Sequence, residues 1–254
     1  MRLTTLGTGT ASPSARVNAG HLVEAGAVTL LLDCGSGIVH RMGEIGANWL
    51  GITHLAFTHF HPDHTLDLTT LIFAWRYGAL PPRSAPLAIL GPVGTTQLIE
   101  RFAAIYGETV NDPGFPLTVR ELAPGERADL GDGVTLEAHK VPHTAESVAY
   151  SVERAGARLV FTGDTGFDTA VAEWAQGCDV LLAECSLPEQ LAVPSHLTPA
   201  QVGVLAEVAN PGRLVLTHFY PPVLDEDIGE IIALRYSGEV ILAVDGWSTD
   251  IEER

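Results

Sequence analysis

The chain has 254 residues, of which 46% are hydrophobic and 18% charged, which excludes a disordered polypeptide and is typical of a well-packed globular protein. Its 14 Lys and Arg against 31 Asp and Glu give a net charge of -17, which disfavours nucleic acids because they are bound by neutralising phosphates. No apolar run approaches the ~20 residues of a membrane span. The three Cys residues form no CxxC pair, so we expect a cytoplasmic protein without disulfides or membrane partners.

Short apolar runs rich in Val, Leu and Ile alternate with segments of helical periodicity and with Gly and Pro. We expect strands over residues 3–6, 28–32, 54–57, 87–90, 134–141, 147–152, 159–161, 180–183, 214–216 and 240–244. We expect helices over residues 37–45, 95–106, 168–174, 198–208 and 226–235, and loops over residues 80–86 and 111–116. This alternation predicts a layered α/β protein, and the absence of linkers and repeats predicts a single domain over residues 1–254.

The densest group of metal-binding side chains lies in residues 58–64, which read THFHPDH. His59 and His61 are two residues apart at the end of a predicted strand, so both side chains should point to the same side. Asp63 and His64 should come from the turn that follows. Imidazole suits zinc and other late divalent ions, and a carboxylate adds charge and a harder oxygen ligand. One such cluster can begin two adjacent metal sites.

Polar residues also follow other predicted strands, where side chains can converge on one edge of a sheet. They are Asp33, His143, Asp164 and His218. A single His or Asp at a strand end is usually a hydrogen-bonded structural residue, but four of them beside the His-rich cluster favour a common site. His139, an even number of residues before His143 on a predicted strand, could support that site from behind.

The ligand types then suffice for two ions. His59, His61 and His143 would supply one ion, and Asp63, His64 and His218 the other. Asp164 could bridge both, because a carboxylate can share its two oxygens. Two ions roughly 3.5–4 Å apart can activate a shared water and hold the attacking and leaving oxygens of a hydrolysis. We expect two zinc ions, although manganese or iron would also suit these ligands.

In this order and at these intervals, the residues resemble the metallo-β-lactamase superfamily over nearly the whole chain. The resemblance implies a four-layer αβ/βα sandwich, in which two mixed sheets are flanked by helices and two metals lie in a cleft at one edge. It also implies that Asp33 orients the ligand loop without touching metal. A closer resemblance, to the ribonuclease Z and phosphodiesterase branch, rests on residues 6–13, 31–35, 161–165, 183–185, 196–201 and 214–219.

In that branch a Glu and a His form a dyad that protonates the leaving oxygen. The resemblance therefore implies that His196 is the general acid and that Glu184 holds its tautomer and raises its pKa. Asp63 is expected among the catalytic residues as well as among the ligands. The resemblance also implies a homodimer.

Two departures from ribonuclease Z bear on the substrate. Only residues 144–163 separate His143 from Asp164, which leaves no room for the long arm that grips tRNA. The last metal His is followed by the sequence FYPP, without the usual Ser and Arg. We therefore expect a binuclear phosphodiesterase for a small phosphodiester, such as a cyclic nucleotide. The alternatives are a tRNA 3′-processing endonuclease, a hydrolase of carboxylic esters, thioesters or lactams, and a non-catalytic metal-binding or redox scaffold.

Overall fold

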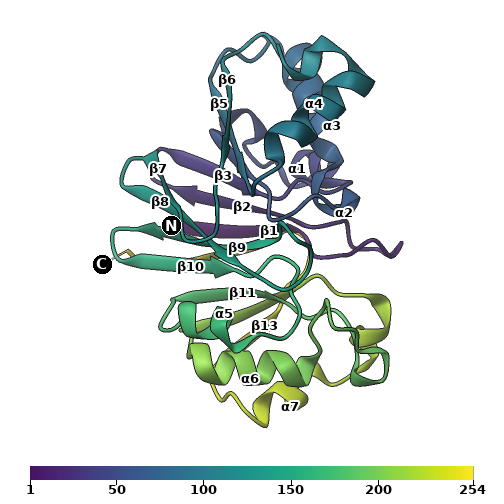
Figure 1. Ribbon diagram of the computed structural model, residues 1–254, viewed down its shortest axis with the longest axis vertical. Coiled ribbons are helices and arrows are strands. Elements are labelled where there is room, and N and C mark those ends of the chain that lie inside the picture. The colour runs from purple at the N-terminus through teal and green to yellow at the C-terminus, as the bar shows by residue number, and fades with distance from the viewer. Residues whose placement is uncertain (254) are drawn as a thin grey trace.

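The computed structural model describes residues 1–253 and contains two seven-stranded mixed sheets that lie between two groups of helices (Figure 1). In spatial order the first sheet consists of β14 (Trp247–Asp250), β1 (Arg2–Gly7), β2 (Gly20–Ala25), β3 (Val28–Leu32), β4 (His54–Ala56), β5 (Leu87–Gly91) and β6 (Leu117–Glu121). The second consists of β13 (Glu239–Leu242), β12 (Arg213–Thr217), β11 (Val180–Glu184), β10 (Ala157–Phe161), β9 (Val148–Arg154), β8 (Val134–Lys140) and β7 (Arg127–Gly131).

Helices cover the outer face of each sheet, as Figure 1 shows. The helices on the side of the first sheet are α1 (Ile38–Ile45), α2 (Pro62–Thr65), α3 (Asp67–Phe73) and α4 (Thr95–Tyr106). Those on the side of the second are α5 (Thr169–Trp174), α6 (Pro199–Ala209) and α7 (Ile228–Ala233). Within residues 1–253, none of the helices combines the length and the apolar character that a membrane crossing requires. The observed layers confirm the predicted αβ/βα sandwich.

The core consists of apolar layers on both faces of each sheet. Leu30 and Leu32 of β3 pack between the two sheets, whereas Leu31 points outward against the helices of the first sheet. In the second sheet Leu182 points inward and Leu181 outward, toward the helices. Because successive side chains on a strand point to opposite faces, strands buried on both faces need continuous apolar runs. Such runs are what made these strands visible in the sequence.

The predicted strands and helices are all present, with ends that shift by at most two residues. Residues 80–86 and 111–116 are irregular, as expected for loops. The prediction missed β2, β6, β7, β14, α2 and α3. Three of these strands, β6, β7 and β14, are edge strands, which present polar side chains to solvent and so have a weak apolar pattern. The predicted helix 226–235 is shorter than expected, because α7 covers only Ile228–Ala233.

The strand directions bring several chain segments to one edge of the sandwich. β3, β4 and β5 are parallel to one another, and so are β10, β11 and β12. β8 is antiparallel to β9, which is antiparallel to β10, so β8 runs in the direction of β10. Residues that follow β4, β8, β10 and β12 therefore emerge where parallel strands end, which is where ligand sites form in such sheets.

Candidate metal centre

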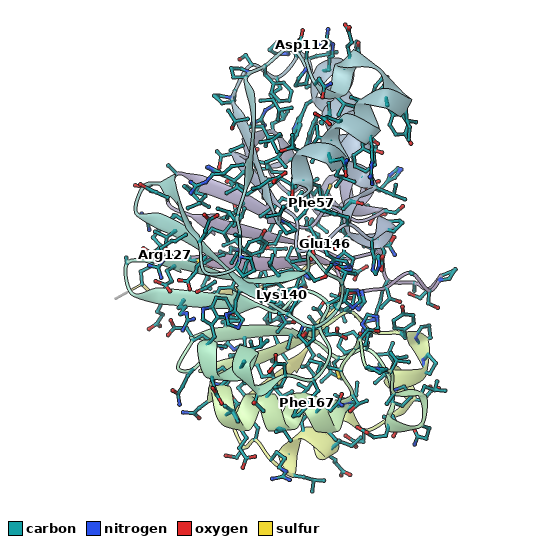
Figure 2. All side chains as sticks on the ribbon, viewed as in Figure 1. Phe57, Asp112, Arg127, Lys140, Glu146 and Phe167 are labelled. Carbon is teal, nitrogen blue, oxygen red and sulfur yellow. The ribbon has the colours of Figure 1, made fainter. Side chains whose placement is uncertain are left out.

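The segments that follow β4, β8, β10 and β12 carry all the predicted ligands to one place. Figure 2 labels Phe57, which follows β4, and Lys140, the last residue of β8; the loops with residues 59–64 and with His143 begin after them. Two sets of side chains each have their ligand atoms within 4.8 Å of one another. The first set is His59, His61, His143 and Asp164. The second set is Asp63, His64 and His218.

The local structure of the His-rich segment differs from the prediction in two ways. β4 ends at Ala56, so His59 and His61 lie in a loop rather than on a strand. Asp63 and His64 lie on α2 and not in a turn, because Pro62 at the first helical position has a fixed φ that suits a helix start. The rings of His59 and His61 still approach each other, with centroids 4.7 Å apart.

The carboxylate of Asp164 lies between the two sets. Its Oδ2 is 3.8 Å from the Nε2 atoms of both His59 and His143, and its Oδ1 is 3.3 Å from Nε2 of His218. Oδ2 is also 3.3 Å from Nε2 of His64. Burial alone would raise the pKa of Asp164, but the charges of His218 and His64 hold it well below its ordinary value. Asp164 is therefore a carboxylate that faces both sets of imidazoles.

The ring nitrogens of His64 and His218 provide a test of whether a metal fits. In each ring Nδ1 is held: that of His64 lies 2.8 Å from Oδ2 of Asp33, and that of His218 lies 3.0 Å from Oγ of Ser186. In each ring Nε2 is buried and makes no hydrogen bond, although an oxygen of Asp164 lies 3.3 Å away. Metal-binding imidazoles usually have one nitrogen fixed by a second residue and the other free for the ion. Three- and four-residue His and Asp sets of this kind fit divalent metals such as zinc.

Charge also favours a cation at this point. Burial opposes ionisation of His64, yet the carboxylates of Asp164 and Asp33 raise its pKa well above the ordinary value. Burial lowers the pKa of His59 well below its ordinary value, and the neighbouring His64 adds to the shift. A metal ion bound here must displace the proton of His64, so its affinity should fall in acid.

Asp33 supports the ligands from beneath, as the resemblance implied. Its Oδ1 accepts a hydrogen bond from the Thr58 N–H at 2.7 Å, and its Oδ2 accepts one from the Thr58 hydroxyl at 2.8 Å. Because Oδ2 also contacts His64, one buried carboxylate fixes both the loop after β4 and the helix α2. Asp33 itself has a φ of 57°, in the left-handed region, where residues other than glycine are uncommon.

The structure also brings Glu184 and His196 together beside the two sets. Nδ1 of His196 lies 3.1 Å from Oε1 of Glu184, whose carboxylate is fully buried. Backbone N–H groups of Thr165 and Leu197 donate hydrogen bonds to the same carboxylate. Burial opposes ionisation of His196, but the hydrogen bond and the charge of Glu184 raise its pKa to about 9. His196, Asp164 and His218 form a third set whose ligand atoms lie within 4.8 Å of one another. Measuring the metal content of a His196 variant would therefore distinguish an acid role of His196 from a ligand role.

The loop that carries His196 is closed at its base. The N–H groups of Ser186 and Leu187 both donate to the carbonyl oxygen of Leu197, at 3.0 and 3.3 Å. Between these ends, residues 189–194 are exposed. His196 therefore lies next to the fixed base of the loop and not at its free end.

Comparison with known proteins agrees with this geometry. The family profile for the beta-lactamase superfamily domain matches residues 28–219. The chain belongs to the metallo-β-lactamase superfamily. A ribonuclease Z from a Mycobacterium species (strain KMS) is 31% identical over 245 residues, which cover 88% of this chain and 85% of the relative. Together these matches identify the chain as a metal-dependent hydrolase.

Two solved structures superpose over nearly the full length of both chains. The metallo-β-lactamase fold protein YhfI from Bacillus subtilis has a TM-score of 0.84 and 22% identity, with 98% of each chain covered. The short form of human tRNase Z has a TM-score of 0.79 and 25% identity, with 99% of this chain and 100% of the human chain covered. The metallo-β-lactamase fold therefore extends beyond the matched domain to both ends of the described chain.

The sequence prediction for this metallo-β-lactamase-fold hydrolase overlooked three residues at the site. Thr58 acts through Asp33, since its hydroxyl donates to the carboxylate that contacts His64. Ser186 contacts Nδ1 of His218 directly, and its hydroxyl donates to Glu184. Tyr220 places its ring beside His196 and His218. Their positions next to predicted site residues were the available signal, but Ser, Thr and Tyr are too common for position alone to indicate a role.

Four histidines lie outside the three sets, and two of them have ring contacts that define their surroundings. His139 stacks on Trp174, with ring centroids 4.6 Å apart, so its described contacts are with α5 rather than with the ligands. His21 of β2 is fully buried, has no hydrogen-bond partner at either ring nitrogen, and meets the ring of Phe161 edge-on. Neither is among the sets that could hold a metal.

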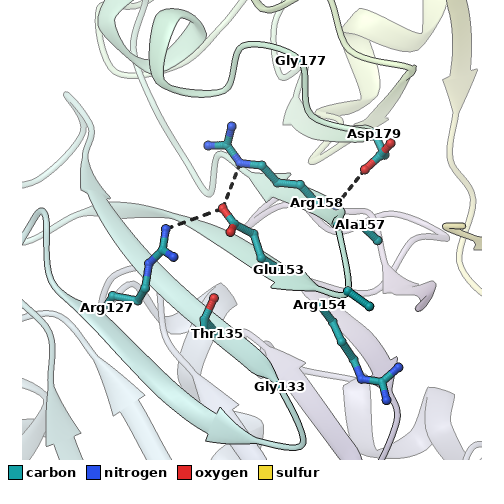
Figure 3. A pocket seen from close by; sticks show the side chains of 11 residues that line it. Arg127, Gly133, Thr135, Glu153, Arg154, Ala157, Arg158, Gly177 and Asp179 are labelled. Carbon is teal, nitrogen blue, oxygen red and sulfur yellow. Dashed lines mark hydrogen bonds and ion pairs between the residues drawn. The ribbon is translucent and has the colours of Figure 1, made fainter. Parts of the chain in front are cut away.

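A separate cavity of about 380 Å³ lies among the turns at the other ends of β8, β9 and β10 (Figure 3). Three arginines of this metallo-β-lactamase-fold chain line it: Arg127, Arg154 and Arg158. Arg127 pairs with Glu137 at 2.6 Å, Arg154 with Glu253 at 2.5 Å, and Arg158 with Glu153 at 3.4 Å. Because each guanidinium already has a carboxylate partner, this cavity is a poor candidate for an anion site.

Proposed function

We propose that this chain is a binuclear, zinc-dependent phosphodiesterase that hydrolyses a small phosphodiester, such as a cyclic nucleotide. The observation that carries the proposal is the position of Asp164, whose two oxygens face two separate sets of imidazoles beside the His196–Glu184 pair. Two adjacent cation sites with a proton donor at hand suit the hydrolysis of a phosphate ester better than a single structural site would.

The residues that would hold the ions follow from the two sets. His59, His61 and His143 would hold one, Asp63, His64 and His218 the other, and Asp164 would be shared. When bound, the ions would supply Lewis-acid charge for the phosphoryl oxygens and would help to ionise the attacking water.

The chain's own side chains would move and hold the protons. His196 would carry a proton toward the leaving oxygen, because its Nδ1 is occupied by Glu184 and its pKa of about 9 keeps the ring protonated near neutral pH. Burial opposes ionisation of Asp63, but His218 and His64 keep its pKa below the ordinary value. Asp63 would therefore remain a carboxylate that accepts a hydrogen bond from the attacking water.

The surroundings of the site favour a small substrate over tRNA. Between His143 and Asp164 the chain forms only a short loop and the strands β9 and β10, without an inserted arm. Lys140 and Arg16, on segments next to the ligand loops, are occupied: Lys140 Nζ donates to the Thr144 carbonyl, and Arg16 donates to the Ala243 carbonyl. Precursor tRNA remains the second candidate, because the related mycobacterial and human proteins are named as ribonuclease Z and tRNase Z.

We also propose that the protein is a cytoplasmic homodimer. Its cysteines are buried and unpaired, which suits a reducing compartment. Phe73, Tyr77 and Ile105 expose 61, 55 and 72% of their surfaces on the α3–α4 side, where a second copy could cover them. Light scattering of the purified protein should give twice the mass of one chain, and a monomer would contradict the proposal.

A substrate panel tests the proposed activity. Metal-replete protein is assayed in parallel with bis(p-nitrophenyl) phosphate, a precursor tRNA and p-nitrophenyl acetate. We expect turnover of the phosphodiester, no cleavage of the tRNA and little hydrolysis of the acetate. Cleavage of precursor tRNA at its 3′ side would favour the second candidate. Hydrolysis of the acetate alone would refute phosphodiesterase action and favour carboxylic esters or lactams.

A further inference from the structure

Tyr220 places an aromatic ring at the site that no metal set and no proton transfer uses. Its ring centroid lies 5.9 Å from that of His196 and 6.1 Å from that of His218. The ring planes are inclined by 68° and 84°, so neither imidazole stacks on it. Among residues 1–253, no Phe or Trp ring, and no other Tyr ring, is paired with Tyr220. A half-buried ring beside the proton donor is thus left with surface for another partner.

The backbone that carries this ring is anchored. The Tyr220 N–H donates to the carbonyl oxygen of Ser186 at 3.2 Å, which ties it to the strand end that carries Glu184. Pro221 and Pro222 follow and begin a short 3₁₀ turn, and Pro221 favours the extended backbone conformation that Tyr220 adopts. The Cα atom of Tyr220 is therefore held in place relative to Glu184 and His218.

The chemistry of the side chain also sets Tyr220 apart from its neighbours. Its ring lies beside His196 and His218, which form a set with Asp164. The side chain provides an uncharged aromatic surface among ionisable ones. Such a surface suits a flat, uncharged part of a substrate whose charged part lies at the metals.

We propose that Tyr220 determines substrate specificity: its ring packs against the flat aromatic group of the phosphodiester, a nucleobase or an aryl group, while the phosphate occupies the metal centre. The inference rests on the proposed function, since it assumes a phosphodiester there. Stacking of one base on one aromatic side chain corresponds to a loss of about 10- to 100-fold in affinity when the ring is removed. An alkyl phosphodiester of the same charge would gain nothing from Tyr220.

Calorimetry with two phosphonates tests this inference without depending on turnover. Phenylphosphonate and methylphosphonate carry the same charged head group and differ by the ring. Each is titrated into metal-loaded wild type, Tyr220→Phe and Tyr220→Leu. Tyr220→Leu should weaken phenylphosphonate by about 10- to 100-fold and leave methylphosphonate unchanged. Tyr220→Phe keeps the ring and should bind both as the wild type does. Tyr106→Leu, an exposed ring at the end of α4, is the matched control and should change neither affinity.

Each alternative outcome has its own meaning. If wild type binds the two phosphonates equally or binds neither, or if Tyr220→Leu keeps its affinity for phenylphosphonate, the specificity role is wrong. If Tyr220→Leu loses both ligands and its metal, Tyr220 maintains the metal centre instead, and the inference also fails. Failure of the proposed function is a separate result: wild type that prefers phenylphosphonate through Tyr220 but hydrolyses no phosphodiester would retain the aromatic subsite and lose the phosphodiesterase assignment.

Discussion

The metal centre and the arginine-lined cavity both gather charged side chains, but they differ in how those side chains are satisfied. In the cavity each of the three arginines has a carboxylate partner from the chain itself. At the candidate metal centre, Nε2 of both His64 and His218 is buried without a hydrogen bond and has an Asp164 oxygen 3.3 Å away, although the other nitrogen of each ring is held. An unpaired buried polar atom costs free energy, so a fold tolerates it where something else pairs with it.

Of the changes considered, removing the carboxylate of Asp164 should have the largest effect on metal binding and turnover. Asp164→Ala takes the oxygens that face both sets of imidazoles and leaves those imidazoles without a common anion. We expect metal loss together with a fall in turnover of more than about 100-fold, beyond the usual effect of a supporting residue. Elemental analysis and the phosphodiesterase assay measure the two quantities on one sample. Retention of both ions by the variant would refute the bridging role of Asp164.

Replacing the proposed acid should separate chemistry from metal binding. His196→Ala removes the proposed proton donor and leaves the two main ligand sets intact. Turnover of a substrate with a poor leaving group should therefore fall by roughly 10²–10⁴-fold. Metal content should stay at the wild-type value. An aryl substrate with a good leaving group serves as the control, because it needs less protonation. Loss of metal in His196→Ala would show instead that His196 acts as a ligand.

His21 extends the comparison, because it is buried and unpartnered but lies outside the metal sets. Burial, followed by the charges of His64 and His218, lowers its pKa to about 3 in the folded chain. Its pKa in the unfolded chain should be near 6.5. Between these values the unfolded chain binds a proton that the folded chain does not, so acidification destabilises the fold by up to about 1.4 kcal/mol per pH unit.

His21→Phe tests this dependence, since Phe fills the space beside Phe161 and does not titrate. Urea unfolding of the metal-free wild type and variant is compared between pH 4 and pH 7. The free energy of unfolding should rise less steeply with pH in the variant. Equal slopes would mean that His21 is protonated or partnered in the folded protein.

The smallest effect is expected at the cavity itself. Arg127→Gln removes a half-exposed guanidinium that pairs with Glu137, so stability should change by less than about 1 kcal/mol. Activity and metal content should equal those of the wild type. A loss of turnover in a correctly folded Arg127→Gln protein would show that the cavity has a role that its paired charges conceal.

The sequence predicted the site best where an apolar strand is followed by a polar residue. Asp164, His143 and His218 were predicted because each follows an apolar strand, and parallel strand ends meet at one edge whatever the details of packing. The helix α2 could not be predicted, because four residues show no helical period. Tyr220 could not be predicted either, because its place beside His196 depends on how two loops far apart in the sequence pack.

The closed base of the loop that carries His196 lets one loop combine a firmly held side chain with an exposed segment that is free to vary. Leu197 is bonded to Ser186, Leu187 and Glu184, whereas residues 189–194 are exposed. The His196 N–H also donates to the Val193 carbonyl oxygen at 3.4 Å, so the end of this segment helps to hold His196. Changes in the length or sequence of residues 189–192 should therefore leave His196 beside Glu184. Those residues are where relatives could diversify, or where an engineer could graft new binding residues, without displacing His196.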